Sequence, residues 1–330
     1  MKIVIPGGRG FLGGTLARAF LRDGHEVVVL SRNPRADGPG RAVDWDAASP
    51  GAWQAELEGA DVVINLAGRS VNCRLTAANR RAIMDSRVDS TRAVGRAIAQ
   101  AARPPRVWLQ ASTATIYAHR YDAPNEEVTG ILGGAETDAP DTWRFSIDVA
   151  TAWERAATEI ALPRTRQVLM RISIVMSPAR GSAFDIMLGL VRHGLGGRFG
   201  NGRQYISWIH ETDFVRAVYQ LIQRGTLSGP VNLAAPDPRP NAEFMRLLRQ
   251  AWGVRFGLPA TEAMLEVGAF FLRTETELIL KSRRVVPGRL LQDGFAFQFP
   301  SWPEAAADLC RQWRAARAGH PITAPPAGNL

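Results

Sequence analysis

The sequence predicts an α/β protein in which a doubly wound parallel sheet carries a smaller, mostly helical C-terminal substrate lobe. A short apolar run at residues 3–5 ends in glycines at positions 7, 10 and 13, and an amphipathic segment follows at residues 12–22. Strand-like apolar runs and helix-like segments then alternate to about residue 176. With 330 residues and 46% hydrophobic content, the chain is long and apolar enough to bury a large core.

The glycine turn at residues 7–13 is the main functional signal. Strand, Gly7-x-x-Gly10-x-x-Gly13 and helix follow in the order of a Rossmann-like dinucleotide-binding unit. Glycines let the backbone approach a pyrophosphate, and the free N–H groups of the helix N-terminus favour the anion. We therefore expect a dinucleotide here, the alternative being an unoccupied strand-turn-helix. The expected contacts are Gly7, Arg9, Gly10, Phe11, Leu12 and Gly13.

The second strand, residues 26–30, ends in a segment that distinguishes two cofactors. An acidic residue there would bind the ribose hydroxyls of NAD, whereas an arginine suits the 2′-phosphate of NADP. Arg32 occupies this place and favours NADP over NAD; the alternative is a solvated surface arginine. Its expected helpers are Ser31, Arg35 and Arg9. A third strand ends near residues 43–46, where Asp44 or Trp45 could border the adenine.

Two further strands end in candidate ligand contacts. Residues 61–66 run into Ala67-Gly68, and residues 106–111 run into Ser112-Thr113. Because ligands bind at the carboxyl ends of the strands in open parallel sheets, Leu66, Ala67 and Gly68 are expected at the cofactor. The hydroxyls of Ser112 and Thr113 would face the nicotinamide, although such residues also commonly begin helices or turns. Helices are predicted at residues 76–102 and 146–161, and a loop beside the cleft at residues 119–141.

The second half of the chain supplies candidate substrate contacts. The apolar strand predicted at residues 168–175 contains one charge, Arg171, which needs a partner or a ligand. Beyond residue 177 the alternation breaks and glycines cluster at residues 194–202, ahead of Arg203 and Gln204. A helix capped by Thr212 or Asp213 comes next. A last strand is expected at residues 231–233, a turn at 236–240, and helices at 242–252 and 260–281.

These elements divide the chain into two parts. We place the dinucleotide-binding core at residues 1–176, with residues 211–235 returning to it. Residues 177–210 and 236–318 form the substrate lobe, and residues 319–330, rich in proline, are expected to be a disordered tail.

Composition narrows the classes of function. The net charge of +9 comes from scattered arginines rather than a basic run with interleaved aromatics, which argues against nucleic acid as a partner. No apolar stretch reaches the ~18 residues of a membrane span, and no signal-like pattern opens the chain, so a cytoplasmic protein is expected. Cys73 and Cys310 form no CxxC pair, and no ligand cluster for a metal is present.

The order of elements and the glycine spacing resemble the extended short-chain dehydrogenase/reductase superfamily. Later blocks narrow the resemblance, over roughly residues 1–310, to its atypical branch of epimerase family proteins, in which a C-terminal domain of unknown function follows the Rossmann unit. Those blocks are Gly194-Leu195-Gly196-Gly197, Gly202-Arg203-Gln204, Ser207-Trp208-Ile209-His210, Gly229-Pro230-Val231-Asn232-Leu233, Arg284-Val285-Val286-Pro287 and Gly294-Phe295-Ala296-Phe297. The resemblance also implies a homodimer paired through the helices at residues 76–102 and 146–161.

The chain departs from the superfamily at its reactive groups. The superfamily's acid/base pair is Tyr-x-x-x-Lys, in which the tyrosine moves the proton and the lysine holds the nicotinamide ribose. Counting back from Glu154 places Ser146 at the tyrosine and Ala150 at the lysine. In the superfamily's Arg-x-x-Asn motif, Arg171 is retained but Ile174 stands where the asparagine would contact a sugar nucleotide. Cofactor binding is therefore predicted more firmly than the usual hydride-transfer chemistry.

Other residues could carry the chemistry. Ser112, Thr113 and Tyr117 are candidates near the nicotinamide, and His210 is the preferred general acid/base. The alternative for His210 is a structural junction with Trp208 at the start of the next helix. The substrate, an unknown small molecule, would meet Arg171, Arg203 and Gln204.

Two hypotheses about function remain open. The first is an NADP-dependent oxidoreductase or epimerase-like enzyme with atypical acid/base residues. The second is an NADP-binding regulatory or redox-sensing protein without catalysis, which the missing Tyr/Lys pair motivates.

Overall fold

The predicted doubly wound parallel sheet is confirmed. The computed structural model describes residues 1–33, 38–137, 140–261, 264 and 280–319. In this part of the chain seven parallel strands form one sheet, in the order β10-β6-β5-β4-β1-β2-β3. The strands are β1 (Lys2–Pro6), β2 (Glu26–Ser31), β3 (Arg41–Asp44), β4 (Val62–Asn65), β5 (Val107–Thr113), β6 (Arg166–Ile172) and β10 (Gly229–Leu233). The order reverses between β1 and β4, and ligands bind at such a switch point.

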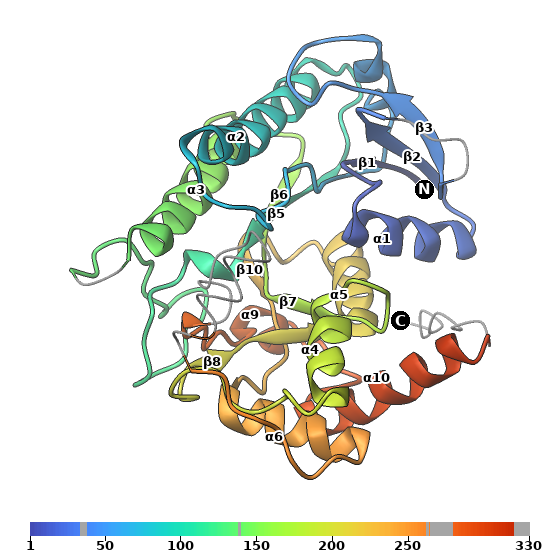
Figure 1. The fold of residues 1–330 in the computed structure, drawn as a ribbon. Helices are drawn as coiled ribbons and strands as arrows, with labels where there is room; N and C mark the ends of the chain where they lie inside the picture. Colours follow the sequence, from blue (N-terminus) through green and yellow to red (C-terminus); the bar gives the residue numbers. More distant parts are fainter. Residues whose placement is uncertain (34–37, 138–139, 262–263, 265–279, 320–330) are drawn as a thin grey trace.

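Helices cover both faces of the sheet (Figure 1). On one face α1 (Phe11–Arg22) and α5 (Glu211–Gln223) pack their apolar sides on alternate strand residues such as Ile3 and Ile5. On the other face lie α2 (Ala77–Gln100) and α3 (Asp141–Thr158), packed over Val4 and Val28. Because successive strand residues point to opposite faces, both faces need apolar cover, and the strands are apolar throughout.

A second layer lies beyond the carboxyl end of β6 (Figure 1). Its helices, in the described part of the chain, are α4 (Ala183–Arg192), α6 (Asn241–Trp252) and α10 (Trp302–Arg317), whereas α9 (Gly288–Gln292) packs on β10 of the main sheet. Two small sheets pair β7 (Ile174–Met176) with β9 (Trp208–His210), and β8 (Tyr205–Ile206) with β11 (Arg239–Pro240). Its core is built around aromatic rings, and Phe244 stacks on Trp302 with 3.7 Å between ring centroids.

Several boundaries differ from the sequence predictions. The strand predicted at residues 168–175 is two strands, because Ser173 bonds through both N and Oγ to the carbonyl of Leu233 and leaves the main sheet. The helix expected at residues 146–161 begins earlier, at Asp141. The cap of α5 is His210 rather than Thr212 or Asp213: its Nδ1 accepts from the Thr212 N–H at 3.1 Å.

Some helices were not predicted, and one predicted helix falls largely outside the described residues. The sequence did not predict α4 or α10, whose amphipathic patterns are interrupted by glycine or placed after the last strand. The helix expected at residues 260–281 falls largely outside the described residues, as does the tail from residue 320 onward. No helix in the described part of the chain has the length and apolarity needed to cross a membrane.

Candidate functional site

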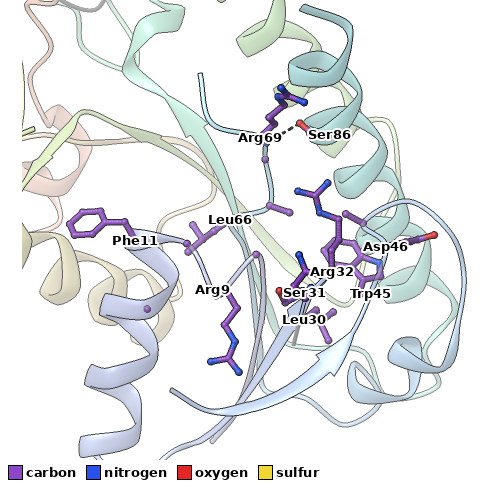
Figure 2. Close-up of a pocket in the computed structure, with 18 of the residues that line it drawn as sticks. Arg9, Phe11, Leu30, Ser31, Arg32, Trp45, Asp46, Leu66, Arg69 and Ser86 are labelled. Atoms are coloured by element: carbon purple, nitrogen blue, oxygen red, sulfur yellow. Dashed lines mark hydrogen bonds between the residues drawn. The ribbon is translucent and has the colours of Figure 1, made fainter. Parts of the chain in front are cut away.

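A cleft of about 950 Å³ opens at the carboxyl ends of β1, β2 and β4. Figure 2 shows Arg9 and Phe11 on the side of the glycine turn and Ser31, Arg32 and Trp45 on the opposite side. The lining includes ten of the predicted cofactor residues: Gly7, Arg9, Gly10, Phe11, Ser31, Arg32, Trp45, Leu66, Ala67 and Gly68. Leu12, Gly13 and Asp44 are not among the lining residues, and Arg35 lies outside the described residues.

The glycine turn meets the conditions for close approach of a phosphate. Gly7 has φ +77°, and an added Cβ would lie 2.7 Å from the Cα of Ala67. Gly10 precedes α1, and among the described residues no side chain caps that helix. The first N–H groups of α1 therefore keep their capacity to bind an anion.

Gly13 has a packing role although it is outside the cleft. An added Cβ would lie 2.5 Å from the Cα of Gly8, so α1 packs directly on the turn. We expect Gly13→Val to lower the free energy of unfolding by about 1–3 kcal/mol through overpacking, and to weaken NADPH binding by displacing α1. Urea unfolding and a fluorescence titration would measure both effects. Gly189→Ala is the control, since its added Cβ meets nothing within 4 Å; equal effects of the two changes would contradict the prediction.

The far end of the cleft combines cations with an aromatic ring. Arg32 is exposed at the end of β2, and the half-buried Arg9 reaches from the glycine turn to Gly38, where an added Cβ would lie 1.3 Å from its Nη1. Trp45 is buried, and its ring packs on Trp53 with 5.2 Å between centroids. Asp44, at the end of β3, is exposed, and Asp46 two residues later lines the cleft instead.

Helix α2 supplies part of the wall that the sequence analysis missed. Four of its residues line the cleft: Ala82, Asp85, Ser86 and Asp89. Ser86 accepts a hydrogen bond from the backbone N–H of Arg69 at 3.0 Å, which Figure 2 shows, and this bond holds the segment after β4 against the helix. The spacing of these residues along one helix face could have indicated them, because the helix after β4 must start at the same sheet edge.

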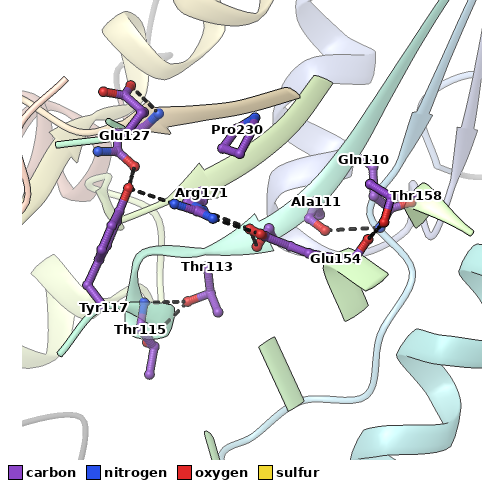
Figure 3. A network of polar contacts seen from close by, with 12 residues as sticks. Gln110, Ala111, Thr113, Thr115, Tyr117, Glu127, Glu154, Thr158, Arg171 and Pro230 are labelled. Carbon is purple, nitrogen blue, oxygen red and sulfur yellow. Dashed lines mark hydrogen bonds and ion pairs between the residues drawn. The ribbon is translucent and has the colours of Figure 1, made fainter. Parts of the chain in front are cut away.

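One buried hydrogen-bonded group, here called the Glu154–Arg171 network, consists of Ser112, Tyr117, Glu154, Arg171 and Asn232. Figure 3 shows Arg171 between Tyr117 and Glu154. Arg171 donates from Nε and Nη2 to the two carboxylate oxygens of Glu154, each at 2.8 Å. It also donates from Nη1 to the hydroxyl of Tyr117 at 2.9 Å. Ser112 donates to Glu154 at 2.6 Å, and Tyr117 donates to Asn232 at 2.9 Å.

The network gives Arg171, the single charge in the apolar run at residues 168–175, a carboxylate partner in Glu154. The side chain of Arg171 is 5% exposed and that of Glu154 12%. Burial by itself lowers the pKa of Arg171, but the hydrogen-bonded carboxylate of Glu154 raises that pKa above its ordinary value. Burial raises the pKa of Tyr117, which keeps its hydroxyl protonated. In this arrangement the hydroxyls of Ser112 and Tyr117 donate to Glu154 and Asn232, and Arg171 donates to Glu154 and Tyr117.

Ala150, the position predicted for the family's lysine, lies in a buried hydrophobic cluster. Ala150 is fully buried and packs with Ala114, Ile116 and Tyr117. Thr113 remains half-buried at the end of β5, where its hydroxyl bonds the hydroxyl of Thr115 at 3.1 Å. Lys281 donates to the carbonyl of Thr115 at 3.1 Å, so the C-terminal segment also reaches this strand end.

His210 occupies a buried junction between α5 and α10. Its Nδ1 caps α5, its Nε2 lies 3.3 Å from a carboxylate oxygen of Asp308, and its ring lies 4.0 Å from that of Phe299. These contacts match the structural alternative for His210. Its role as a general acid/base stays a prediction without support from this geometry.

The three residues predicted to bind substrate are not gathered in one place. Arg171 belongs to the Glu154–Arg171 network, and Gln204 is buried with its amide donating to the carbonyl of Phe199 at 3.0 Å. Arg203 is exposed, with its guanidinium over the ring of Tyr121. No group of three or more potential metal ligands occurs within the described ranges.

Family models match both parts of the chain. The model described as NAD dependent epimerase/dehydratase family matches residues 3–234, and a domain of unknown function, DUF1731, matches residues 260–309. Two named relatives are 31% identical: epimerase family protein SDR39U1 of Homo sapiens, over 94% of this chain and 99% of the relative, and epimerase family protein YfhF of Bacillus subtilis, over 94% and 98%.

Solved structures resemble the fold as a whole. The crystal structure of human epimerase family protein SDR39U1 (isoform2) with NADPH has a TM-score of 0.81 and 30% identity, covering 94% of this chain and 99% of that chain. A UDP-N-acetylglucosamine 4-epimerase from Bacillus cereus has a TM-score of 0.73 at 17% identity, covering 95% of this chain and 99% of that one, a likeness of fold alone.

Proposed function

The chain belongs to the NAD dependent epimerase/dehydratase family, and from this premise we propose that it is an NADP(H)-binding, epimerase- or oxidoreductase-like enzyme of the extended short-chain type acting on a small molecule. The resemblance to epimerase family proteins with a C-terminal domain of unknown function is confirmed by the two family matches. The observation that carries the proposal is the cleft at the carboxyl ends of the strands, whose lining includes both the glycine turn and Arg32.

The choice of NADP(H) over NAD(H) depends on charge. Arg9 and Arg32 line the cleft at the end of β2, where the adenosine ribose of a dinucleotide lies in this fold. A planar guanidinium binds a phosphate with two donors, which suits the extra 2′-phosphate. The crystal structure of human SDR39U1, which is 30% identical in sequence to this chain, contains NADPH, and this supports the same cofactor here.

The chemistry must use groups other than the family's usual pair. Ser146 cannot replace a tyrosine as the proton donor at the same reach, and the buried Ala150 offers no charge. Of the three residues predicted near the nicotinamide, Thr113 at the end of β5 is our candidate, because its half-buried hydroxyl bonds the neighbouring Thr115, whereas those of Ser112 and Tyr117 are bonded within the buried network.

A second candidate function follows from the same network. A protein that binds NADP(H) without turnover could report the redox state of the nicotinamide pool to a partner. The observation that favours it is the commitment of Ser112 and Tyr117 to Glu154 and Asn232, which leaves neither hydroxyl to transfer a proton.

A cofactor titration tests the proposal and separates the two candidates. We expect NADPH to bind more tightly than NADH, measured by the change in nicotinamide fluorescence on titration of the purified protein. A panel of carbonyl compounds would then be screened for NADPH consumption. Absence of binding by either cofactor would contradict both candidates. Turnover of a panel member supports the enzyme, whereas tight binding without turnover over a broad panel favours the regulatory protein.

A further inference from the structure

Arg87 is a charged residue on α2 that neither the glycine turn nor the network uses. Helices α2 and α3 run in the same direction, as two ion pairs show: Arg80 near the start of α2 pairs with Asp141 at the start of α3, and Arg92 further along α2 pairs with Glu159 just after α3. Between these pairs the guanidinium of Arg87 lies over the ring of Trp153, 5.0 Å from its centroid. Trp153 is three residues, or about one helical turn, after Ala150. Arg87 therefore packs on α3 about one helical turn from Ala150, the position at which the family's lysine is expected.

The same guanidinium touches the strand end that lines the cleft. An added Cβ at Gly68 would lie 3.4 Å from Cζ of Arg87, so the charge packs directly behind this glycine. Nη1 donates to the carbonyl of Arg69 at 3.0 Å and to that of Ile83 at 3.1 Å. These bonds anchor one corner of the guanidinium between the segment after β4 and the helix.

The Nε and Nη2 atoms of Arg87 can still donate hydrogen bonds. Among the described residues, Arg87 makes no ion pair, and its hydrogen bonds use Nη1 alone. Burial lowers the pKa of Arg87 to about 10, with no carboxylate to offset it. The side chain stays charged at neutral pH. A half-buried cation held by two carbonyls and an aromatic face retains capacity to bind polar oxygens.

We propose that Arg87 binds the ribose of the nicotinamide half of NADP(H), supplying from α2 the positive charge that Ala150 cannot supply from α3. This inference rests on the proposed cofactor site. The planar fork of the guanidinium presents two donors side by side, which matches the adjacent 2′- and 3′-hydroxyls of a ribose. Because the tyrosine is also replaced, by Ser146, Arg87 positions the cofactor and has no proton donor to activate.

The test compares NADPH with 2′,5′-ADP, a ligand that contains the adenosine half and its 2′-phosphate but no nicotinamide ribose. Dissociation constants would be measured on the full chain for the wild type, Arg87→Met, Arg87→Lys and Arg81→Met. Arg81 is exposed on the same helix and serves as the matched control. We expect Arg87→Met to weaken NADPH by about tenfold or more, as for loss of a charge-assisted hydrogen bond, and to leave 2′,5′-ADP within about twofold of the wild type.

The remaining variants separate charge from packing. Arg87→Lys keeps the charge without the fork and is expected to fall between the wild type and Arg87→Met, while Arg81→Met changes neither ligand. Equal weakening of NADPH and 2′,5′-ADP by Arg87→Met would show a purely structural role and overturn the inference, as would unchanged NADPH affinity. Retained 2′,5′-ADP binding reports that the variant is folded. A wild type that binds neither ligand would instead refute the proposed cofactor site.

Discussion

Replacing Glu154 by alanine is expected to lower the free energy of unfolding by about 3–5 kcal/mol, the usual loss when one partner of a buried ion pair is removed. The change leaves the guanidinium of Arg171 buried in the main sheet and takes away the acceptor of Ser112. Within the network, Arg171 would then keep one hydrogen-bond partner, the hydroxyl of Tyr117. Urea denaturation of the wild type and the variant measures the difference.

Two control variants test whether the loss of stability in Glu154→Ala arises because the ion pair is buried. Glu159→Ala removes a carboxylate from α3's exposed end, where it pairs with Arg92, and should cost at most about 1 kcal/mol. The double change Glu154→Met and Arg171→Met replaces both charges by apolar side chains and should recover much of the loss. A Glu154→Ala variant as stable as Glu159→Ala would show that the buried pair contributes little to folding.

Arg32→Ala is expected to weaken NADPH by about 10–100-fold, because a charge-assisted hydrogen bond contributes about 1.5–3 kcal/mol. NADH lacks the 2′-phosphate, so its affinity should change by less than about threefold. Arg32 lies exposed at the end of β2, so its loss opens no cavity in the core. Fluorescence titrations with both cofactors measure the two dissociation constants.

The comparison is internal, since one variant is tested with two cofactors that differ by one phosphate. Arg96→Ala, at an exposed position of α2 outside the cleft, controls for the loss of a positive charge from the surface. An equal loss of NADPH and NADH affinity in Arg32→Ala would argue against a 2′-phosphate contact. NADPH binding that survives at full strength would contradict the assignment of the 2′-phosphate contact to Arg32 and would favour its expected helpers, such as Arg9.

The local elements of the dinucleotide unit could be predicted from the sequence because each depends on neighbours in the chain. A buried parallel strand is apolar throughout, and the turn after β1 requires glycine at position 7, where φ is +77°. The second layer was harder to predict. Its strands are two or three residues long, and α10 packs on α6, which lies far from it in sequence.

Most of the residues that line the candidate cofactor cleft could be predicted from the order of the strands. Strand ends of a parallel sheet meet at one edge, so Arg32 and Gly68 could be placed together from the order of elements alone. The wall formed by α2 was missed: the spacing of its residues indicates that they share one helix face, but that this face meets the cleft depends on how the helix packs on the sheet.

The sequence by itself determined that Arg171 needs a partner, since a lone charge in an apolar strand is costly. The family resemblance also predicts that Ser146 and Ala150 stand at the positions of the acid/base pair. Only the tertiary structure decided that the partner is Glu154 and that Ser112 and Tyr117 join it, because these residues come from β5, the segment after it, and α3. It likewise placed the guanidinium of Arg87 over the ring of Trp153, about one helical turn from Ala150. Such contacts arise when separate elements pack together, and no spacing along one element encodes them.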